Sequence, residues 1–246
     1  MLVSIIICNL NYARYLPDAL DSVANQSYKE IELLLIDDGS SDNSKSVLES
    51  FRSDFKERFT PIRLHLYNEN QGKLSRLNKH IPELSGELSL ILDSDDFLDE
   101  SFLTVSIHEL IKQNTGFVYT QCFLVNELGE KLVDGKNGYP LIGKSCDWDR
   151  ELLYTASYIP ECGLTRTEAL KQAVPFDEQI KIGTKHHKWN KIAMAGWTGC
   201  YIPKPLFSYR MHDRNLSGIG RHILGNQSPI SENVILSGYW KTRPTR

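Results

Sequence analysis

The fold is decided by residues 88–96, which read Leu88-Ser89-Leu90-Ile91-Leu92-Asp93-Ser94-Asp95-Asp96. Their apolar half is typical of a strand that is buried on both faces of a parallel sheet. Open α/β sheets bind ligands beyond the carboxyl ends of their strands, where these three aspartates stand. Crowded carboxylates repel one another, so they favour a hard divalent cation, Mg²⁺ or Mn²⁺, whose other ligands are substrate phosphates. The alternative interpretation is a solvated turn that caps the next helix.

Strands and helices alternate in the chain before this stretch. Apolar runs and helical spacing predict strands over 3–8, 31–36 and 62–67, and helices over 15–23, 43–58 and 71–81. The short connections imply right-handed crossovers and an α/β fold, with a Rossmann-like, mainly parallel sheet flanked by helices. Polar clusters at Asn9–Asn11 and Asp37–Asp38 follow two of these strands, so we expect both at the edge that carries Asp93.

After about residue 115 the pattern becomes irregular. It predicts a hairpin of 117–125 with 131–133, a loop over 135–143, helices over 148–154, 166–173 and 186–195, and a strand over 197–202. We find no internal repeat and no low-complexity linker. The chain is therefore interpreted as one domain over 1–246, with a ligand-binding half up to about 115, an irregular half over 116–220 and a tail over 221–246.

The composition excludes several classes of protein. The chain has 246 residues, 41% hydrophobic content and a net charge of −3, which is ordinary for a globular protein and gives no general attraction to nucleic acid or anionic membranes. Its 5 cysteines are scattered without a C-x-x-C pair, so we expect reduced thiols and a cytoplasmic protein. We see no signal peptide and no apolar run of about 18 residues, which leaves peripheral contact with the inner face of a membrane open.

The absence of several common motifs narrows the class of ligand that the chain can be expected to bind. A cation held by carboxylates and completed by two phosphates suits a nucleoside diphosphate. The chain has neither a P-loop nor a G-x-G-x-x-G after a strand, which excludes the common NTPase and dinucleotide sites. Enzymes that synthesise nucleotide sugars would carry a Gly-rich basic loop after the first strand, whereas this chain has Cys8-Asn9-Leu10-Asn11-Tyr12-Ala13-Arg14. The sequence thus favours transfer from a nucleotide sugar over its synthesis.

Four ordered blocks resemble the family 2 inverting glycosyltransferases of GT-A fold. They are residues 3–16, 19–28, 32–42, which end in Asp37-Asp38-Gly39-Ser40-Ser41-Asp42, and 92–96; the match resumes at 176–178 and 195–217. The resemblance implies transfer of a sugar, with inversion, from a nucleoside-diphosphate sugar of UDP or dTDP type to a glycan or glycolipid acceptor. It also implies a role in surface polysaccharide or glycolipid assembly and no nucleic-acid partner; the oligomeric state stays open.

The resemblance also implies roles for residues at the nucleotide end. Asn9 and Asn11 stand where the family contacts the base and the ribose. Asp38 stands where a carboxylate accepts the imide N–H of the base, which suits uracil or thymine better than adenine. Arg76 matches an arginine near the base or diphosphate; the alternative is an exposed helix arginine.

Roles at the metal follow in the same way. Asp93 would face the ribose, with Ser94 beside it in the donor-binding motif. Asp95 would be the metal ligand, supported by Asp93 and Asp96. His212 looks like the family's late histidine near the metal and diphosphate, although a lone histidine is more often structural.

The expected general base is missing. An inverting transferase needs a group, usually a carboxylate, that takes the proton of the acceptor hydroxyl. In the family it lies in a Glu-Asp pair after a Phe-Asp-Glu like Phe176-Asp177-Glu178, but alignment places Thr184 and Lys185 on that pair. Either His186 or His187 serves as the base, or a desolvated Lys185 does, or the protein binds nucleotide sugar and transfers poorly.

The segment 181–191 supports one further interpretation. It carries Lys181, Lys185, His186, His187, Lys188 and Lys191, a cluster that would bind an acidic acceptor or a polyanion such as nucleic acid. Trp189 and Trp197 would stack on a sugar at the acceptor side. The plainer alternative is a solvated helix face with the tryptophans in the core.

Overall fold

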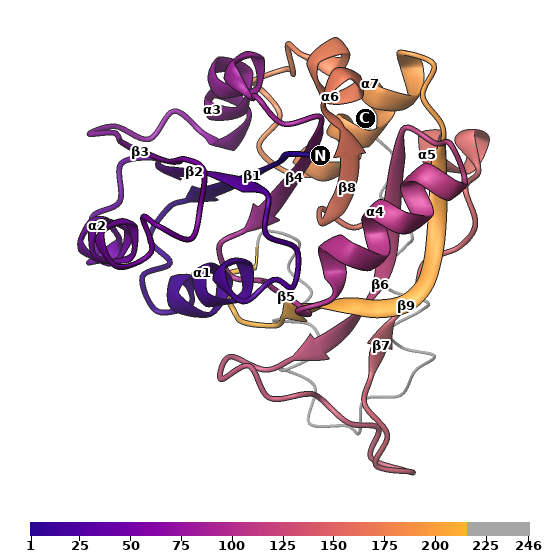
Figure 1. Cartoon of the computed structure of the whole chain (residues 1–246). Helices are drawn as coiled ribbons and strands as arrows, with labels where there is room; N and C mark the ends of the chain where they lie inside the picture. The colour runs from indigo at the N-terminus through magenta and orange to yellow at the C-terminus, as the bar shows by residue number, and fades with distance from the viewer. Residues whose placement is uncertain (216–246) are drawn as a thin grey trace.

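The computed structural model describes residues 1–215 and shows a mixed sheet with helices packed on both faces (Figure 1). The strands are β1 (Val3–Asn9), β2 (Ile31–Asp37), β3 (Ile62–Leu66), β4 (Leu88–Asp93), β5 (Phe97–Leu98), β6 (Phe117–Val125), β7 (Ile142–Gly143), β8 (Gly163–Arg166) and β9 (Gly199–Arg210). The helices are α1 (Leu16–Ala24), α2 (Ser44–Asp54), α3 (Lys73–His80), a 3₁₀ turn η1 (Ile81–Glu83), α4 (Phe102–Lys112), α5 (Arg150–Thr155), α6 (Thr167–Ala173) and α7 (Thr184–Met194).

The first four strands pair in parallel and bring the predicted polar clusters to one edge. The sheet order is β3-β2-β1-β4-β8-β6-β9-β5, with β7 paired to β6. In this register Asn9 lies opposite Asp37, and Cys8 lies opposite Asp93. The sequence prediction of an α/β fold with a polar carboxyl edge is therefore confirmed.

The side chains of the central strands belong alternately to two hydrophobic cores, one on each face of the sheet, because successive residues of a strand point to opposite faces. On one face Ile5, Leu33 and Leu90 pack with the apolar sides of α1, α2 and α4. On the other face Ile6 and Leu34 pack with α3, α6 and α7. Both faces of the central strands are thus covered, which explains their nearly uninterrupted apolar sequence.

The second half of the chain extends the same sheet with mixed strand directions. β8 runs antiparallel to β4, β6 antiparallel to β8, and β9 parallel to β6. Of the predicted hairpin, the strand 117–125 is formed as β6, but only one isolated bridge, Val125 with Lys131, joins it to 131–133; a second bridge, Val133 with Pro140, reaches into the predicted loop. The strands β5 and β8 were not predicted, because a strand of two to four residues is too short to show the alternation of apolar and polar residues.

β9 is longer than the predicted 197–202. The prolines after Ile202 argued against a continuous strand, since proline cannot donate to a ladder. The structure accommodates them in an irregularity: Thr120 pairs with Ile202, and its neighbour Gln121 pairs with Pro205. The strand then continues to Arg210 and carries the chain back to the acidic edge.

Two further observations bear on the predictions from composition. All five cysteines are unpaired, as predicted. Among the described residues no helix has the length and apolarity needed to cross a bilayer. The predicted tail over 221–246 and the end of the half over 116–220 lie outside the described residues.

Candidate functional site

Three carboxylates gather where β4 ends. Ligand atoms of Asp93, Asp95 and Asp96 all lie within 4.8 Å of one another, in a turn closed by the bond from Asp96 N to Asp93 O. Burial and the charges of Asp95 and Asp93 raise the pKa of Asp96 well above its usual value. Desolvation, with Glu161 and Asp95, also raises the pKa of Asp93 against the opposing effect of Lys73. A divalent cation with oxygen ligands fits this donor set, since it would relieve the repulsion.

His212 meets this acidic cluster from the other end of the chain. Its Nε2 lies 3.0 Å from Oδ2 of Asp95, and its fully buried ring stacks on Tyr15 with centroids 4.8 Å apart. The backbone N–H of Arg210 donates to Oδ1 of Asp96 at 3.0 Å, which fixes the end of β9 against the turn. The structure therefore brings together Asp93, Asp95 and His212, the three predicted metal-binding residues; the side chain of Ser94 between them is buried.

Asp38 and Arg76 form a buried ion pair. Nε of Arg76 lies 2.5 Å from Oδ1 of Asp38, and both residues are 3% exposed. The backbone N–H groups of Gln71 and Gly72 donate to the same carboxylate at 3.1 and 2.7 Å. The guanidinium also lies over the ring of Tyr67, 3.5 Å from its centroid. Arg76 is thus not an exposed helix arginine, and protein donors already reach both oxygens of Asp38.

Asn9 and Asn11 hold the loops after β1 and β2 together. Nδ2 of Asn9 donates to Asp37 and to Ser40, while Oδ1 of Asn11 accepts the backbone N–H of Ser41 at 2.7 Å. Oδ1 of Asn9 is buried and has no hydrogen-bond partner within residues 1–215. Buried acceptors are nearly always satisfied, so this atom is open to a donor from a bound ligand or a water molecule.

The sequence prediction missed a chain of alternating charges that leads from the partly buried Asp93 and Lys73 to the buried Glu161 and Lys188. Nζ of Lys73 contacts Oδ1 of Asp93 at 2.5 Å and Oε1 of Glu161 at 3.3 Å, and Nζ of Lys188 contacts the same Oε1 at 2.9 Å. Although burial opposes ionisation, the ammonium groups of Lys188 and Lys73 hold the pKa of Glu161 at about 2. Lys73 could have been suspected from its place at the start of a predicted helix, but nothing in the irregular sequence around Glu161 marks it.

The three residues proposed as catalytic bases are placed differently. Nε2 of His187 accepts the backbone N–H of Asp177 at 3.0 Å, and Nε2 of His186 lies 2.6 Å from the carbonyl oxygen of Leu153 in α5. Neither histidine contacts the acidic cluster. The charge of Lys185 weakly opposes the rise in the pKa of Asp96 and adds to the lowering of the pKa of Glu161, so this lysine is the member of the three that is electrostatically coupled to the cluster.

The two tryptophans proposed for the acceptor side differ in exposure, since Trp189 is buried and Trp197 is only partly buried. Trp189 is fully buried, donates from Nε1 to the carbonyl oxygen of Pro160 and packs on Phe117, so its ring is closed to a sugar. The expected stacking role of Trp189 is therefore wrong, because its helix face is turned to the core. Trp197 packs against Gly116 and donates to Gln172, beside the first residues of β6. Lys188 is also buried, so the segment 181–191 is not one continuous cationic surface.

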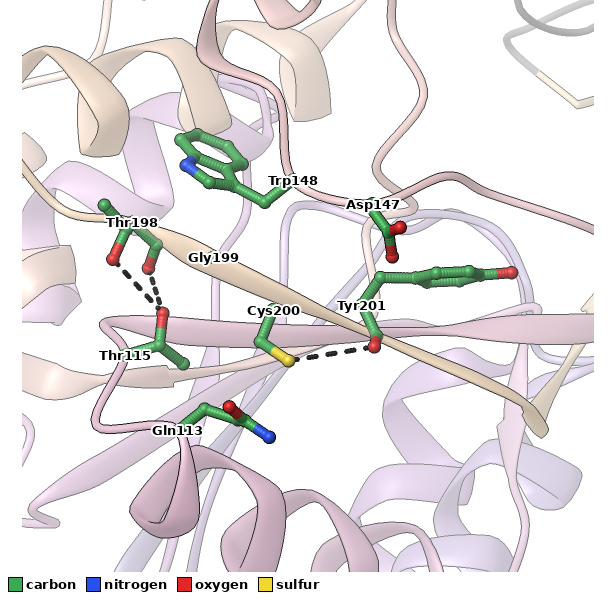
Figure 2. A pocket seen from close by; sticks show the side chains of 8 residues that line it. All are labelled: Gln113, Thr115, Asp147, Trp148, Thr198, Gly199, Cys200 and Tyr201. Carbon is green, nitrogen blue, oxygen red and sulfur yellow. Dashed lines mark hydrogen bonds between the residues drawn. The ribbon is translucent and has the colours of Figure 1, made fainter.

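Two polar cavities of similar size lie among the residues that the structure describes. One, of about 340 Å³, is lined by Tyr12, Tyr15 and Asn11 and adjoins His212. The other, of about 350 Å³, is lined by Trp148, Asp147 and Tyr201 around the first residues of β6 and β9 (Figure 2). Because β6 begins level with the start of β4, this second cavity lies at the opposite sheet edge from Asp93.

Solved structures with a similar fold are known. S. aureus TarS in complex with UDP-GlcNAc aligns with a TM-score of 0.67 and 17% identity, covering 96% of this chain and 69% of that one. A mannosyltransferase of Pyrobaculum calidifontis, in complex with GDP-Man and Mn²⁺, aligns with a TM-score of 0.65 and 18% identity over 93% of this chain and 65% of the other. At these identities the likeness establishes the fold, which is GT-A.

Curated relatives match by sequence. A cholesterol galactosyltransferase of Borreliella burgdorferi is 31% identical over 157 residues, 62% of this chain and 42% of that protein. An uncharacterized glycosyltransferase of Rickettsia typhi is 32% identical over 220 residues, 86% of this chain and 64% of that protein. The chain spans less than two thirds of the length of either relative. The family model described as glycosyl transferase family 2 matches residues 4–173, and the chain belongs to this family.

Proposed function

We propose that the protein transfers a sugar from a nucleoside-diphosphate sugar to a hydroxyl group of a glycan or glycolipid, with inversion at the anomeric carbon. The observation that carries the proposal is the contact of His212 with Asp95 beside Asp93 and Asp96. Asp95, Asp93 and His212 would hold Mg²⁺ or Mn²⁺, which when bound neutralises the charge of the departing diphosphate. We further propose a cytoplasmic site of action in surface polysaccharide or glycolipid assembly, in keeping with the five unpaired thiols.

The nucleotide end supports a uracil or thymine base. The carboxylate of Asp38 is suited to accept an imide N–H, and the unsatisfied Oδ1 of Asn9 accepts a further donor. Binding would require a rearrangement around Asp38, because Arg76, Gln71 and Gly72 already donate to it. The TarS structures contain UDP and UDP-GlcNAc, and the mannosyltransferase structure contains GDP-Man, so the base is the first property to test.

One observation favours a second candidate, a nucleotide-sugar-binding protein with weak transfer activity. Lys185 stands where the family carries its catalytic carboxylate, and His186 and His187 are bound to backbone groups away from the acidic cluster. A protonated ammonium cannot take the proton of the acceptor hydroxyl. Glu161 does not replace the missing base, because it is buried between Lys73 and Lys188 and a carboxylate with a pKa of about 2 accepts a proton poorly at neutral pH.

Donor turnover separates the two candidates. The native protein, Lys185→Asp and Asp95→Ala are incubated with UDP-sugars, dTDP-sugars and Mn²⁺, and released nucleoside diphosphate is measured with and without glycan and lipid acceptors. Turnover by the native protein that Asp95→Ala abolishes supports the transferase. Turnover that appears only in Lys185→Asp supports the weakened protein. Absence of turnover and of nucleotide binding in all three would contradict both.

A further inference from the structure

A second group of metal-ligating side chains lies away from the acidic cluster. His65 on β3, His80 at the end of α3 and Glu83 in η1 each offer a ligand atom, and these atoms lie within 4.8 Å of one another. The two imidazole rings have centroids 4.3 Å apart at an angle of 41°. The residues come from the edge strand of the sheet and from the helix packed beside it (Figure 1), and none of them serves the proposed transfer reaction.

His65 supplies an independent sign of a missing partner. Its Nε2 is buried and makes no hydrogen bond to any described residue. Buried polar atoms in folded proteins nearly always have a hydrogen-bond partner, so one without a partner calls for an explanation. Nδ1 of His80 lies 3.3 Å from Oε2 of Glu83, which provides a nitrogen and an oxygen on the same side of the cluster. A cation bound between the three side chains would give Nε2 of His65 the partner that it lacks.

A hydrogen bond behind His80 already orients its ring. The hydroxyl group of Tyr67 lies 2.8 Å from Nε2 of His80, which leaves Nδ1 to face Glu83. Hydrogen bonds of this kind fix the tautomer and the direction of a metal-ligating histidine. His80 is almost fully buried, whereas the side chain of Glu83 is 49% exposed and gives an ion a path from solvent.

The types of ligand atom in the cluster indicate which metal ion it would bind. Two imidazole nitrogens with one carboxylate oxygen are typical zinc ligands, whereas Mg²⁺ prefers oxygen ligands throughout. Two cations lie nearby, but Arg63 is paired with Glu32 at 3.1 Å and the ammonium of Lys79 lies over the ring of Tyr67.

We propose that His65, His80 and Glu83 bind one zinc-type transition-metal ion, with a water molecule as the fourth ligand. The ion would fasten the edge strand β3 to α3 and η1. It would act at a distance from the chemistry, although Tyr67 touches both His80 and Arg76, the partner of Asp38. This site is independent of the proposed function, because it shares no residue with the acidic cluster.

The test is a zinc titration of the full chain after chelator treatment, in excess Mg²⁺ to occupy the acidic cluster, against a chromogenic zinc chelator. We expect one Zn²⁺ per chain, and Co²⁺ in its place should give the visible spectrum of a tetrahedral site. Glu83→Gln and His65→Gln should each weaken binding by more than about tenfold, the lower limit for loss of a group that merely orients a ligand. Because Glu83 is half exposed, its substitution leaves the fold intact.

Two controls make the result specific. His108→Gln removes an exposed histidine that also contacts a glutamate, Glu109, on α4, and it should bind zinc as the native protein does. Asp95→Ala should likewise retain the zinc ion. Failure of the native protein to bind Zn²⁺, or unweakened binding in both Glu83→Gln and His65→Gln, would overturn the proposal, and loss of that binding in Asp95→Ala would assign the ion to the acidic cluster.

Discussion

Nε2 of His212 lies 3.0 Å from Oδ2 of Asp95, although 117 residues separate the two along the chain. The contact exists because β9 runs beside β6 and returns to the edge at which β4 ends. Arg210, the last residue of β9, secures the return through its bond to Asp96. The acidic cluster is thus completed by a part of the chain that is distant from it in sequence.

Replacing His212 tests whether this contact serves the cation. His212→Asn should raise the Mn²⁺ concentration needed for half-maximal UDP binding by about tenfold or more, as expected for loss of a group that binds the ion or orients its ligand. Calorimetric titration of UDP at a series of Mn²⁺ concentrations measures this. His108→Asn, at an exposed histidine, is the matched control. An unchanged Mn²⁺ requirement would assign His212 a packing role against Tyr12 and Tyr15.

Removing the charge of Asp38 should destabilise the protein. Asp38→Ala leaves the guanidinium of Arg76 buried without its counter-ion, and breaking such a buried pair costs about 3–5 kcal/mol. Urea denaturation gives the free energy of unfolding, and Lys56→Ala, which breaks an exposed pair with Glu57, should change it very little. Equal, small losses for both variants would show that Arg76 finds other partners.

The crowded carboxylates predict a pH dependence of stability. A carboxyl group whose pKa is raised on folding favours the folded state at low pH, and this contribution is lost as the pH rises through the folded value. Asp96 has such a raised pKa, so its ionisation should destabilise the cation-free protein above the ordinary aspartate value of about 3.9.

The comparison of interest is Asp96→Asn against the native protein, both freed of cations. The amide oxygen of the substituted side chain carries no charge but can still accept the N–H of Arg210, so the variant should gain stability relative to the native protein as the pH rises. Unfolding curves at several pH values measure the difference. Mn²⁺ should restore the stability that the native protein loses at higher pH and should change the stability of the variant less. If the stability of the two proteins varied with pH in the same way, the idea that Asp96 is crowded by other carboxylates would be refuted.

Glu161 and Lys188 should behave as a coupled pair. Glu161→Leu strands a buried ammonium and should cost about 3–5 kcal/mol, whereas Glu161→Leu with Lys188→Leu should recover much of the loss because both charges are removed. A double-mutant cycle in urea gives the coupling free energy. Additive losses would mean that Lys73 alone balances Glu161.

Much of the fold was accessible from sequence because the central strands are buried on both faces. Continuous apolar runs such as Val3–Asn9 and Leu88–Asp93 are readily predicted as buried strands, and the polar residues after them mark the sheet edge at which we expect the ligand. The structure pairs Asp38 with Arg76 and places His212 at Asp95, and the binding roles that the resemblance implied for these residues stay predictions.

The structure of the chain after about residue 115 could not be predicted in detail, for physical reasons. Its short strands have no readable period, and Glu161 becomes visible only when Lys73 and Lys188 converge on it from two helices. Trp189 follows a lysine and two histidines in a polar helix, so its burial could not be read from its neighbours. The side chains that face the acceptor depend on loop geometry rather than on a repeating pattern.

The central claim is that the acidic cluster binds a nucleoside diphosphate through a divalent cation. Its most direct test is calorimetric titration of UDP, dTDP and GDP into the native protein and into Asp95→Ala, each with Mn²⁺ and with a chelator. The account predicts binding of UDP or dTDP by the native protein that requires Mn²⁺ and is lost in Asp95→Ala. Nucleotide binding that persists with the chelator and in Asp95→Ala, or no binding at all, would contradict it.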